Sequence, residues 1–216
     1  MNFSTSASLA EATGTSYSVN CVNNSTTDWV FYVYQTMPQQ PSDIFSLAWF
    51  ASPYKISVGS SIRFNWTIDY SFVWGNTGTV TPGVTFDAGG TVPCDLAGEN
   101  MTTFSLDNNA PQLSTPVEGG QAGSLTINEA GNVPNDVFST GIGMSGYGTF
   151  VQQAYANTTQ VYTPEPEYWV AAATEMQMGV VLAQTVNQAA SFKFEPNVYS
   201  IKATLGSDNL WTIENE

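Results

Sequence analysis

The sequence contains no histidine and only four basic residues among its 216 residues. Without histidine, Ser-His-Asp hydrolases, Cys-His proteases and HExxH metalloenzymes are excluded. The four cations stand against 18 acids, which gives a formal net charge of −14. Such a chain cannot neutralise a phosphate backbone, and it has little attraction to anionic lipid. We therefore expect neither a nucleic-acid partner nor a membrane partner.

Cysteine is also scarce, since Cys21 and Cys94 are the only two. Two cysteines without histidine do not make a zinc site, and no phosphate-binding or dinucleotide-binding motif is present, so we expect no cofactor. Met1–Ala10 lacks the basic start and apolar run of a secretory signal, which predicts an intracellular protein of the cytoplasm or a vacuole. In that setting we expect reduced, buried thiols. A disulfide within the chain or between molecules is the alternative.

Aromatic residues are plentiful, at 13% of the chain, and many occur in alternating patterns. In Ser61–Trp74, "SIRFNWTIDYSFVW", apolar and polar residues alternate, which predicts one long β-strand with one apolar face. The side chains expected to be buried are Phe64, Trp66 and Ile68, and those expected to be less buried are Arg63, Asn65 and Thr67. We interpret the aromatics mainly as a core, with a carbohydrate platform as the alternative.

Short strand-like runs recur along the rest of the chain, with turn residues between them. They include Ser16–Val22, Trp29–Gln35, Ser46–Ala51, Val84–Asp87, Thr102–Leu106, Ser124–Asn128, Phe150–Tyr155, Gly179–Val186, Ser200–Leu205 and Leu210–Glu214. We interpret Asn108–Gly123 and Gly141–Gly148 as loops, and Ala171–Gln177 as a short helix or a strand. The pattern predicts an all-β protein, a single-domain antiparallel β-sandwich over residues 1–216, with barrel-like closure as the alternative.

Carboxylates are the remaining candidates for chemistry. Glu165 and Glu167 flank a proline beside Tyr168 and Trp169, an arrangement that resembles a sugar cleft. We expect a solvated loop edge here, with a catalytic pair as the less favoured alternative. A second acidic group, consisting of Asp87, Asp95 and Glu99, has oxygen ligands suited to calcium, although ordinary turn residues are the preferred interpretation.

Three stretches carry a resemblance to known proteins: Asp43–Pro53, Tyr70–Phe86 and Pro164–Val170. They resemble a family of uncharacterised bacterial β-rich proteins. In its low charge and its high content of Ser, Thr, Asn and Gln, the chain also resembles the octins, the crystal-forming proteins of zygomycete fungi. The octin resemblance implies a crystal-matrix protein of the vacuole and assigns no site residue.

These observations favour a non-enzymatic structural protein that associates with copies of itself into an ordered assembly or an intracellular crystal. Short neutral polar side chains support this hypothesis, because they lose less conformational entropy in lattice contacts than Lys or Glu. The alternative is a lectin-like β-sandwich that binds a carbohydrate or another small ligand. A glycan-active enzyme that depends on carboxylates is the third hypothesis.

Overall fold

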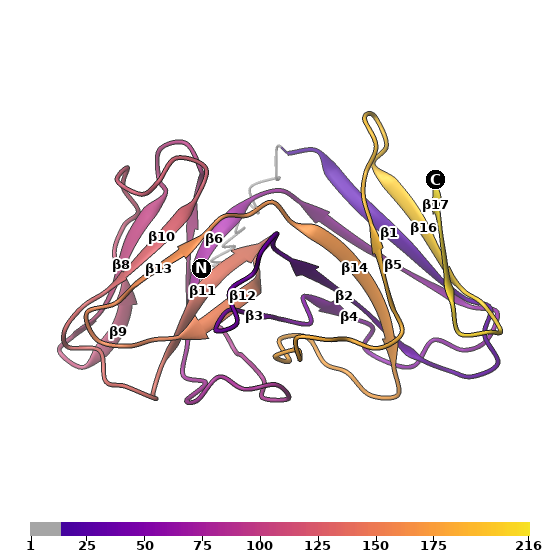
Figure 1. The fold of residues 1–216 in the computed structure, drawn as a ribbon, viewed down its shortest axis with the longest axis horizontal. Coiled ribbons are helices and arrows are strands. Elements are labelled where there is room, and N and C mark those ends of the chain that lie inside the picture. Colours follow the sequence, from indigo (N-terminus) through magenta and orange to yellow (C-terminus); the bar gives the residue numbers. More distant parts are fainter. Residues whose placement is uncertain (1–13) are drawn as a thin grey trace, which may run out of the picture.

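The computed structural model describes residues 14–216, which form 17 β-strands and no helix. The expectation about Met1–Ala10 therefore lies outside the described residues. Within residues 14–216 there is no helix of the length and apolar character needed to cross a membrane. The strands make four sheets, which pack in two pairs (Figure 1). The predicted all-β class and sandwich packing are confirmed, but two sheet pairs lie side by side where one sandwich was predicted.

The first sandwich, on the right of Figure 1, packs the sheet β17-β16-β1-β5 against the sheet β15-β14-β2-β4. Its strands are β1 (Ser16–Asn23), β2 (Val30–Thr36), β4 (Phe50–Ala51), β5 (Ser61–Thr67), β14 (Glu167–Ala173), β15 (Ala189–Phe192), β16 (Ser200–Leu205) and β17 (Trp211–Asn215). Most neighbours are antiparallel, although β1 and β16 run parallel. A parallel pair needs a long connection, and these two strands come from opposite ends of the described chain.

The second sandwich, on the left, packs the sheet β13-β10-β8-β9 against the sheet β3-β12-β11-β6-β7. Its strands are β3 (Phe45–Ser46), β6 (Tyr70–Gly75), β7 (Gly90–Cys94), β8 (Met101–Asp107), β9 (Ala110–Leu113), β10 (Leu125–Glu129), β11 (Ser139–Met144), β12 (Tyr147–Gln153) and β13 (Thr159–Tyr162). Besides β11, three of these strands, β7, β9 and β13, were not predicted from the sequence. Each is short, and β7 and β9 contain proline, which weakens the strand signal.

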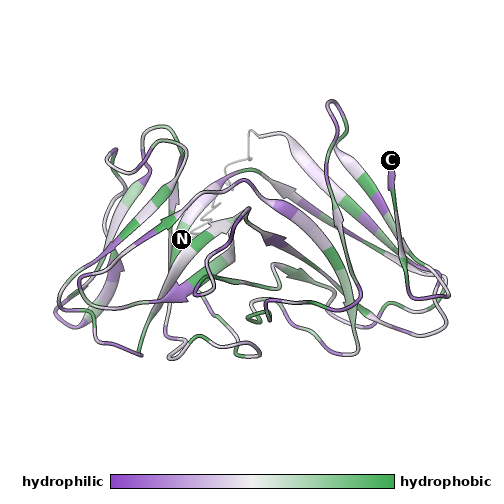
Figure 2. Ribbon diagram, in the orientation of Figure 1, coloured by the Kyte–Doolittle hydropathy of each residue, from purple (hydrophilic) through white to green (hydrophobic). Residues whose placement is uncertain are grey.

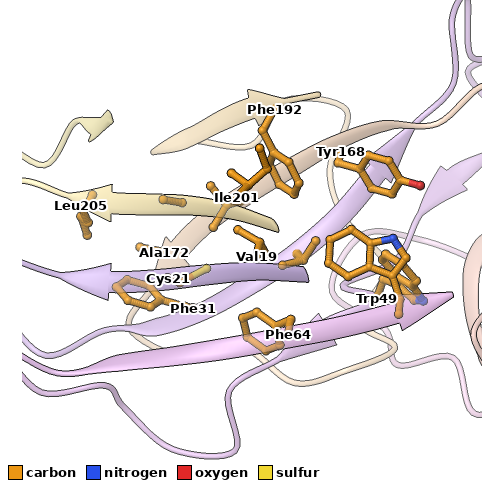
Figure 3. Close-up of a cluster of buried hydrophobic side chains, with 14 of the residues drawn as sticks. Val19, Cys21, Phe31, Trp49, Phe64, Tyr168, Ala172, Phe192, Ile201 and Leu205 are labelled. Carbon is orange, nitrogen blue, oxygen red and sulfur yellow. The ribbon is translucent and has the colours of Figure 1, made fainter. Parts of the chain in front are cut away.

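Each sandwich has its own hydrophobic core. In the first, Val19 and Phe64 from one sheet meet Phe31 and Ala172 from the other, and all four are buried (Figure 3). In the second, the core includes Phe72, Phe104, Ile127, Phe150 and Tyr162. Hydrophobic bands alternate with polar bands along many strands (Figure 2), as expected when one face of a sheet is buried.

The chain passes between the two sandwiches four times, so no single cut in the sequence separates them. The crossings are the connections β2–β3, β3–β4, β5–β6 and β13–β14. Trp49 lies in the β3–β4 crossing and is buried in the first core. Its indole N–H donates a hydrogen bond to the Met144 carbonyl of β11 at 3.0 Å. The two sandwiches are therefore joined by a buried hydrogen bond as well as by the chain.

The single long strand predicted over Ser61–Trp74 is in fact two strands. β5 belongs to the first sandwich and β6 to the second. Phe64 and Trp66 are buried as predicted, but Ile68 is 48% exposed. β5 buries one face in the first core and β6 buries one face in the second, so the apolar–polar alternation of the sequence continues across the crossing. Ile68 lies at the crossing itself, where neither core covers it.

Hydrogen bonds hold this crossing in place. The Asp69 carboxylate accepts hydrogen bonds from the Thr67 hydroxyl at 2.9 Å and from the Ser145 backbone N–H at 3.0 Å. Ser145 lies in the turn between β11 and β12, so the crossing is tied to a hairpin of the second sandwich.

The interpretation of Gly141–Gly148 as a loop is wrong, because this stretch forms the hairpin of β11 and β12. Ser145 and Gly146 both have positive φ, as in the two-residue turns that favour hairpins. Gly141 is required by packing, since a Cβ there would overlap the Phe150 carbonyl oxygen. These glycines let the buried strands approach closely. In a single sequence, a glycine that serves close packing looks the same as a glycine in a loop.

Three smaller predictions also need correction. Ser46–Ala51 is divided between β3 and β4 in different sandwiches, and neither Val84–Asp87 nor Gly179–Val186 forms a regular strand. They contribute isolated bridges instead, such as Thr85 to Val180. In Ala171–Gln177, the first three residues end β14 and no helix follows.

Trp66 provides a direct test of the first core. The substitution Trp66→Ala should lower the free energy of unfolding by about 3–5 kcal/mol, because the buried indole packs against Trp49 and Tyr168. The neighbouring Asn65→Ala is the control and should change it by less than about 0.5 kcal/mol, since Asn65 is exposed. Urea unfolding measures both. A loss below about 1 kcal/mol for Trp66→Ala would contradict this description of the core.

Candidate functional site

An open pocket of about 540 Å³ lies where the chain passes between the sandwiches. Three of the four crossings line it, through Pro38 after β2, Ile68 after β5, and Glu165 and Pro166 before β14. Its volume falls within the range of roughly 300–1,000 Å³ that is usual for small-ligand sites. Small-ligand sites also occur preferentially at junctions between folded units.

Aromatic side chains form one wall of the pocket. Tyr17 comes from β1, Tyr168 from β14, and Phe194 from the segment after β15. The ring centroids of Tyr17 and Phe194 are 4.9 Å apart, and those of Tyr168 and Phe194 are 5.8 Å apart. Trp66 lies behind this wall, with its ring centroid 5.7 Å from that of Phe194. Packing against the first core therefore holds the wall in position.

The wall carries polar groups without partners inside the protein. Tyr168 is buried, yet no atom of residues 14–216 makes a hydrogen bond to its hydroxyl. Figure 3 shows this hydroxyl directed away from the aliphatic part of the core. Burial raises the pKa of Tyr168 to about 12, although the nearby indole N–H of Trp66 opposes this shift. That N–H reaches no acceptor with hydrogen-bond geometry in the described chain.

The Trp66 N–H is buried without a partner, whereas the Tyr168 hydroxyl is not a buried group and opens into the pocket. The Tyr168 hydroxyl lines an open pocket, so a bound molecule can supply the missing partner. The floor of the pocket is therefore suited to a ligand that has hydrogen-bonding groups.

Charged side chains form the rim. Glu165 and Lys193 are exposed, and Glu167 is half-buried at the start of β14. None of these three side chains makes an ion pair or a hydrogen bond within residues 14–216. Pro166 restricts the backbone of Glu165 to an extended conformation. Glu167 pairs with Thr36, so its carboxylate lies on the opposite face of β14 from Tyr168, where its charge acts on Tyr34. Glu165 and Lys193 therefore supply one charge of each sign at the rim.

Comparison with known proteins assigns the chain to a family. The family model described as RhiA matches residues 14–216. The chain belongs to the RhiA family. It is 50% identical over 207 residues to Protein RhiA of Rhizobium leguminosarum bv. viciae, a match that covers 95% of this chain and 89% of that protein. No solved structure matches the chain.

The expected resemblance to bacterial proteins is thus confirmed at the level of the RhiA family. Neither match supports the resemblance to octins. The matched residues coincide with the described range, so the two sandwiches, the crossings and the pocket all lie within the family match.

The structure places the sequence-predicted residues of this RhiA-family protein in two different environments. Glu167 borders the pocket, but its carboxylate lies on the face of β14 beside Tyr34. Glu165 and Tyr168 do share the pocket, as the resemblance to a sugar cleft suggested. Trp169 does not, because successive residues of a strand point to opposite faces. It lines a separate hollow of about 250 Å³ on the other side of β14. There its ring stacks on Tyr34, and its indole N–H donates to the Thr36 hydroxyl at 2.9 Å.

The remaining pocket residues were not predicted as site residues. Tyr17, Lys193 and Phe194 come from segments far from Glu165 in the sequence. The pairing of β14 with β15 and the packing of one sheet on the other bring them together. Ile68 gave no local signal either, because the apolar–polar alternation continues unbroken across the crossing.

The acidic residues proposed as calcium ligands are used differently. Asp95 accepts hydrogen bonds from the backbone N–H groups of Ala97 at 2.7 Å and Gly98 at 2.6 Å, which lowers its pKa. It therefore stabilises a turn, the preferred interpretation from the sequence. No group of three His, Cys, Asp or Glu side chains within residues 14–216 is arranged to hold a metal ion, so Asp87, Asp95 and Glu99 are not brought together.

Both cysteines are free and buried, and the structure contains no disulfide between them. Cys21 packs in the first core and Cys94 in the second, so the pairing considered from the sequence is not formed. Burial raises the pKa of both thiols, to about 12 for Cys94, where the charges of Asp95 and Glu99 add to the effect. Both residues therefore act as small core side chains.

A buried carboxylate lies outside the pocket. Glu129 of β10 is 3% exposed. Its Oε1 accepts hydrogen bonds from the Thr140 hydroxyl at 2.6 Å and the Gln160 amide at 2.8 Å. Its Oε2 accepts from the Thr158 hydroxyl at 2.7 Å and the Tyr155 backbone N–H. Burial raises the pKa of Glu129, and these hydrogen bonds oppose the shift. The group is structural, because every acceptor already has its donor.

Glu129 gives a prediction about stability and pH. Glu129→Gln should lower the free energy of unfolding by about 1–3 kcal/mol. The variant has an NH₂ group in place of one carboxylate oxygen, and this donor would face the donors that now bond to that oxygen. Burial raises the pKa of Glu129, so the folded state binds its proton more tightly than the unfolded state does. The stability that Glu129 contributes is therefore fully present below its unfolded pKa and is lost as the pH rises through its folded pKa. The gap between wild type and variant should therefore widen from pH 7 to pH 5 in urea unfolding.

The control for this experiment is Glu118→Gln, which makes the same chemical change at an exposed site. It should leave the free energy of unfolding within about 0.5 kcal/mol of wild type. A gap for Glu129→Gln that narrows on acidification would show that the hydrogen bonds outweigh burial and lower the pKa.

Proposed function

We propose that this protein is a non-enzymatic binding protein, and that the pocket between its sandwiches takes a small polyhydroxylated ligand, such as a mono- or disaccharide. The observation that carries the proposal is an aromatic wall, formed by Tyr17, Tyr168 and Phe194, that lines an open pocket of about 540 Å³. This favours the lectin-like alternative over self-association as the main function.

The chemistry of the wall suits a saccharide. A sugar ring has a C–H face that packs on aromatic rings and hydroxyl groups that exchange hydrogen bonds. Phe194 and Tyr17 supply the rings, and the Tyr168 hydroxyl supplies a polar group beside them. A pocket of about 540 Å³ has room for one or two sugar rings.

Binding without catalysis is the simpler proposal for the carboxylates. The Glu167 carboxylate lies on the face of β14 opposite Tyr168, so Glu165 is the carboxylate at the pocket among the described residues. A glycosidase needs two carboxylates that flank the scissile bond from opposite sides. Recognition requires only that a carboxylate accepts hydrogen bonds from the ligand.

The binding proposal can be tested by titration calorimetry with neutral mono- and disaccharides. Phe194→Ala should weaken binding by about tenfold or more, because it removes an aromatic contact surface. Tyr168→Phe should weaken it about three- to tenfold, because it removes one hydrogen bond. The control is Tyr155→Phe, which removes an exposed hydroxyl of the second sandwich. If no sugar gives a saturable signal with the folded wild-type protein, the proposal is wrong.

Self-association remains a second proposal, and one structural feature favours it. β5 is an edge strand, and its outward side chains are neutral and polar apart from Arg63. Open edges of this kind can pair with another copy of the chain. Repulsion between molecules of net charge −14 opposes such pairing at neutral pH.

The charge sets the conditions for assembly. Because there is no histidine, net charge should change little from pH 8 to about pH 5.5 and then fall as carboxylates protonate near pH 4. We expect association to be promoted by acid or salt, with a pH midpoint of about 4–5. Light scattering from pH 8 to pH 4 measures this. A protein that stays monomeric throughout, at concentrations up to about millimolar, would remove the self-association proposal.

A further inference from the structure

We infer that the ligand is a neutral oligosaccharide, a chain of at least three sugar rings that runs out of the pocket along a row of aromatic side chains. The inference rests on the proposed binding function and adds to it the length of the ligand. The continuation of the aromatic wall beyond the pocket carries it, and the backbone that holds this wall, the tilt of its rings and the charge at the rim support it.

The aromatic wall does not stop at the pocket. Tyr17, Tyr168 and Phe194 line the pocket, and Tyr17 also packs on Tyr199, which lies outside the lining. The ring centroids are 5.8 Å apart for Tyr168 and Phe194, and 4.9 Å apart for Phe194 and Tyr17. Those of Tyr17 and Tyr199 are 5.7 Å apart. These four side chains form an unbroken aromatic row from the pocket to the surface.

Tyr199 is the exposed end of the aromatic row. It is 46% exposed, whereas Tyr168 is buried and Tyr17 and Phe194 are half-buried. A ring that only closed the end of the first core would bury most of its surface, because burial of apolar area stabilises the fold. Tyr199 instead leaves nearly half of its surface to solvent. A sugar ring can pack on that surface and exchange hydrogen bonds with the hydroxyl.

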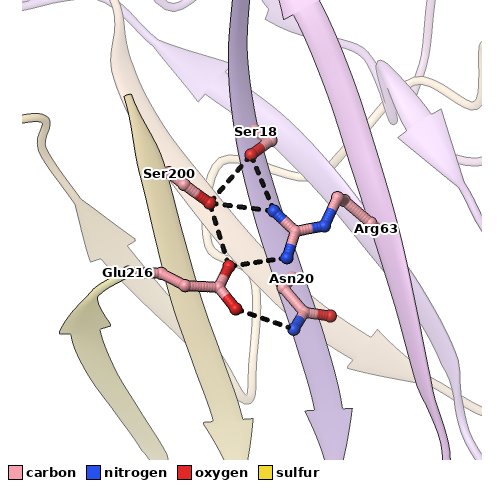
Figure 4. A network of polar contacts seen from close by, with 5 residues as sticks. All are labelled: Ser18, Asn20, Arg63, Ser200 and Glu216. Atoms are coloured by element: carbon pink, nitrogen blue, oxygen red, sulfur yellow. Dashed lines mark hydrogen bonds and ion pairs between the residues drawn. The ribbon is translucent and has the colours of Figure 1, made fainter. Parts of the chain in front are cut away.

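Two neighbouring strands hold the outer part of the aromatic row. β1 and β16 run parallel with Ser18 opposite Ser200, and Tyr17 and Tyr199 come one residue before these serines. The two serine hydroxyls are hydrogen-bonded at 2.9 Å, and Arg63 donates to both (Figure 4). The Ser18 N–H also donates to the Tyr199 carbonyl at 2.9 Å. Because the backbone of both tyrosines is already fixed, a ligand loses less free energy in ordering it.

The tilt of the rings favours one kind of glycan. Neighbouring rings of the aromatic row are inclined to one another by 81°, 64° and 58°. A flat polysaccharide surface needs coplanar rings, since every ring must present its face in the same plane. Rings that turn from one to the next suit a single soluble chain, whose sugar rings also turn about their linkages.

The charge of the protein favours a neutral chain. Glu165 and Lys193 supply one charge of each sign at the rim, so the two offset each other. The net charge of −14 repels an acidic glycan. Ring packing and hydrogen bonds are then the contacts that attract the ligand, and a neutral sugar makes both.

The experiment measures affinity against chain length by titration calorimetry. The probes are glucose, cellobiose, cellotriose and cellotetraose, and the malto-oligosaccharides of the same lengths supply a second linkage. The pocket has room for one or two sugar rings, so the short sugars should bind there alone. In the series that binds better, we expect the tri- or tetrasaccharide to bind about tenfold more tightly than the disaccharide.

Tyr199→Ala should remove this gain. It should weaken binding of the tri- and tetrasaccharide about three- to tenfold and change binding of the shorter sugars less than twofold, because it deletes only the outer contact. Tyr199→Phe keeps the ring and should retain most of the gain. Tyr54→Ala is the matched control, because it removes an exposed tyrosine from the connection between β4 and β5, outside the aromatic row. It should leave every affinity unchanged.

Equal affinity for short and long chains in both series would overturn the inference and leave the binding function standing. An effect of Tyr199→Ala that does not depend on chain length would do the same, as would binding of a mono- or disaccharide without binding of any longer chain. Failure of every sugar, together with the saccharides tested above, would overturn both. Circular dichroism confirms that each variant is folded.

Discussion

The packing of Trp66 against Tyr168 is the contact on which the rest of the structure depends. Trp66 belongs to β5 and Tyr168 to β14, so their rings, 5.3 Å apart, join the two sheets of the first sandwich. Trp49 packs on Trp66 at 5.3 Å and carries its indole N–H to the Met144 carbonyl, which connects this aromatic group to the second sandwich. One cluster of rings therefore holds the two sheets together and fixes one sandwich beside the other.

The same contact explains why the pocket lies where it does. Beyond Trp66 the strand ends, and the chain crosses to the second sandwich through Ile68 and Asp69. Beyond Tyr168 in the opposite direction, Glu165 and Pro166 come from another crossing. Where several connections leave a core at one end, they cannot pack as closely as strands do, and the space between them becomes a pocket. Aromatic rings that belong to the core become its wall on one side.

Much of the fold was predictable from local patterns, and the failures have specific physical causes. β1, β2, β8, β10 and β16 were predicted because alternation or apolar runs reflect burial of one or both faces. β11 was missed because its glycines serve close packing with β12, which looks like loop composition. Ile68 was predicted to be buried because the two-residue alternation of the sequence continues unchanged where the chain leaves one sheet for another. Of the site, Glu165 and Tyr168 were recognised together, whereas Lys193 and Phe194 had no local signal.

The sequence by itself determined the all-β class, the acidic surface and the absence of histidine chemistry, because composition and two-residue periodicity are properties of the chain alone. Only the tertiary structure decided that there are two sandwiches, that Cys21 and Cys94 belong to separate cores, and that Tyr17 and Phe194 stand beside Glu165. The reason is that strand pairing and sheet packing join residues far apart in sequence. Local preferences specify that a strand forms and which face it buries, but not which partner covers that face.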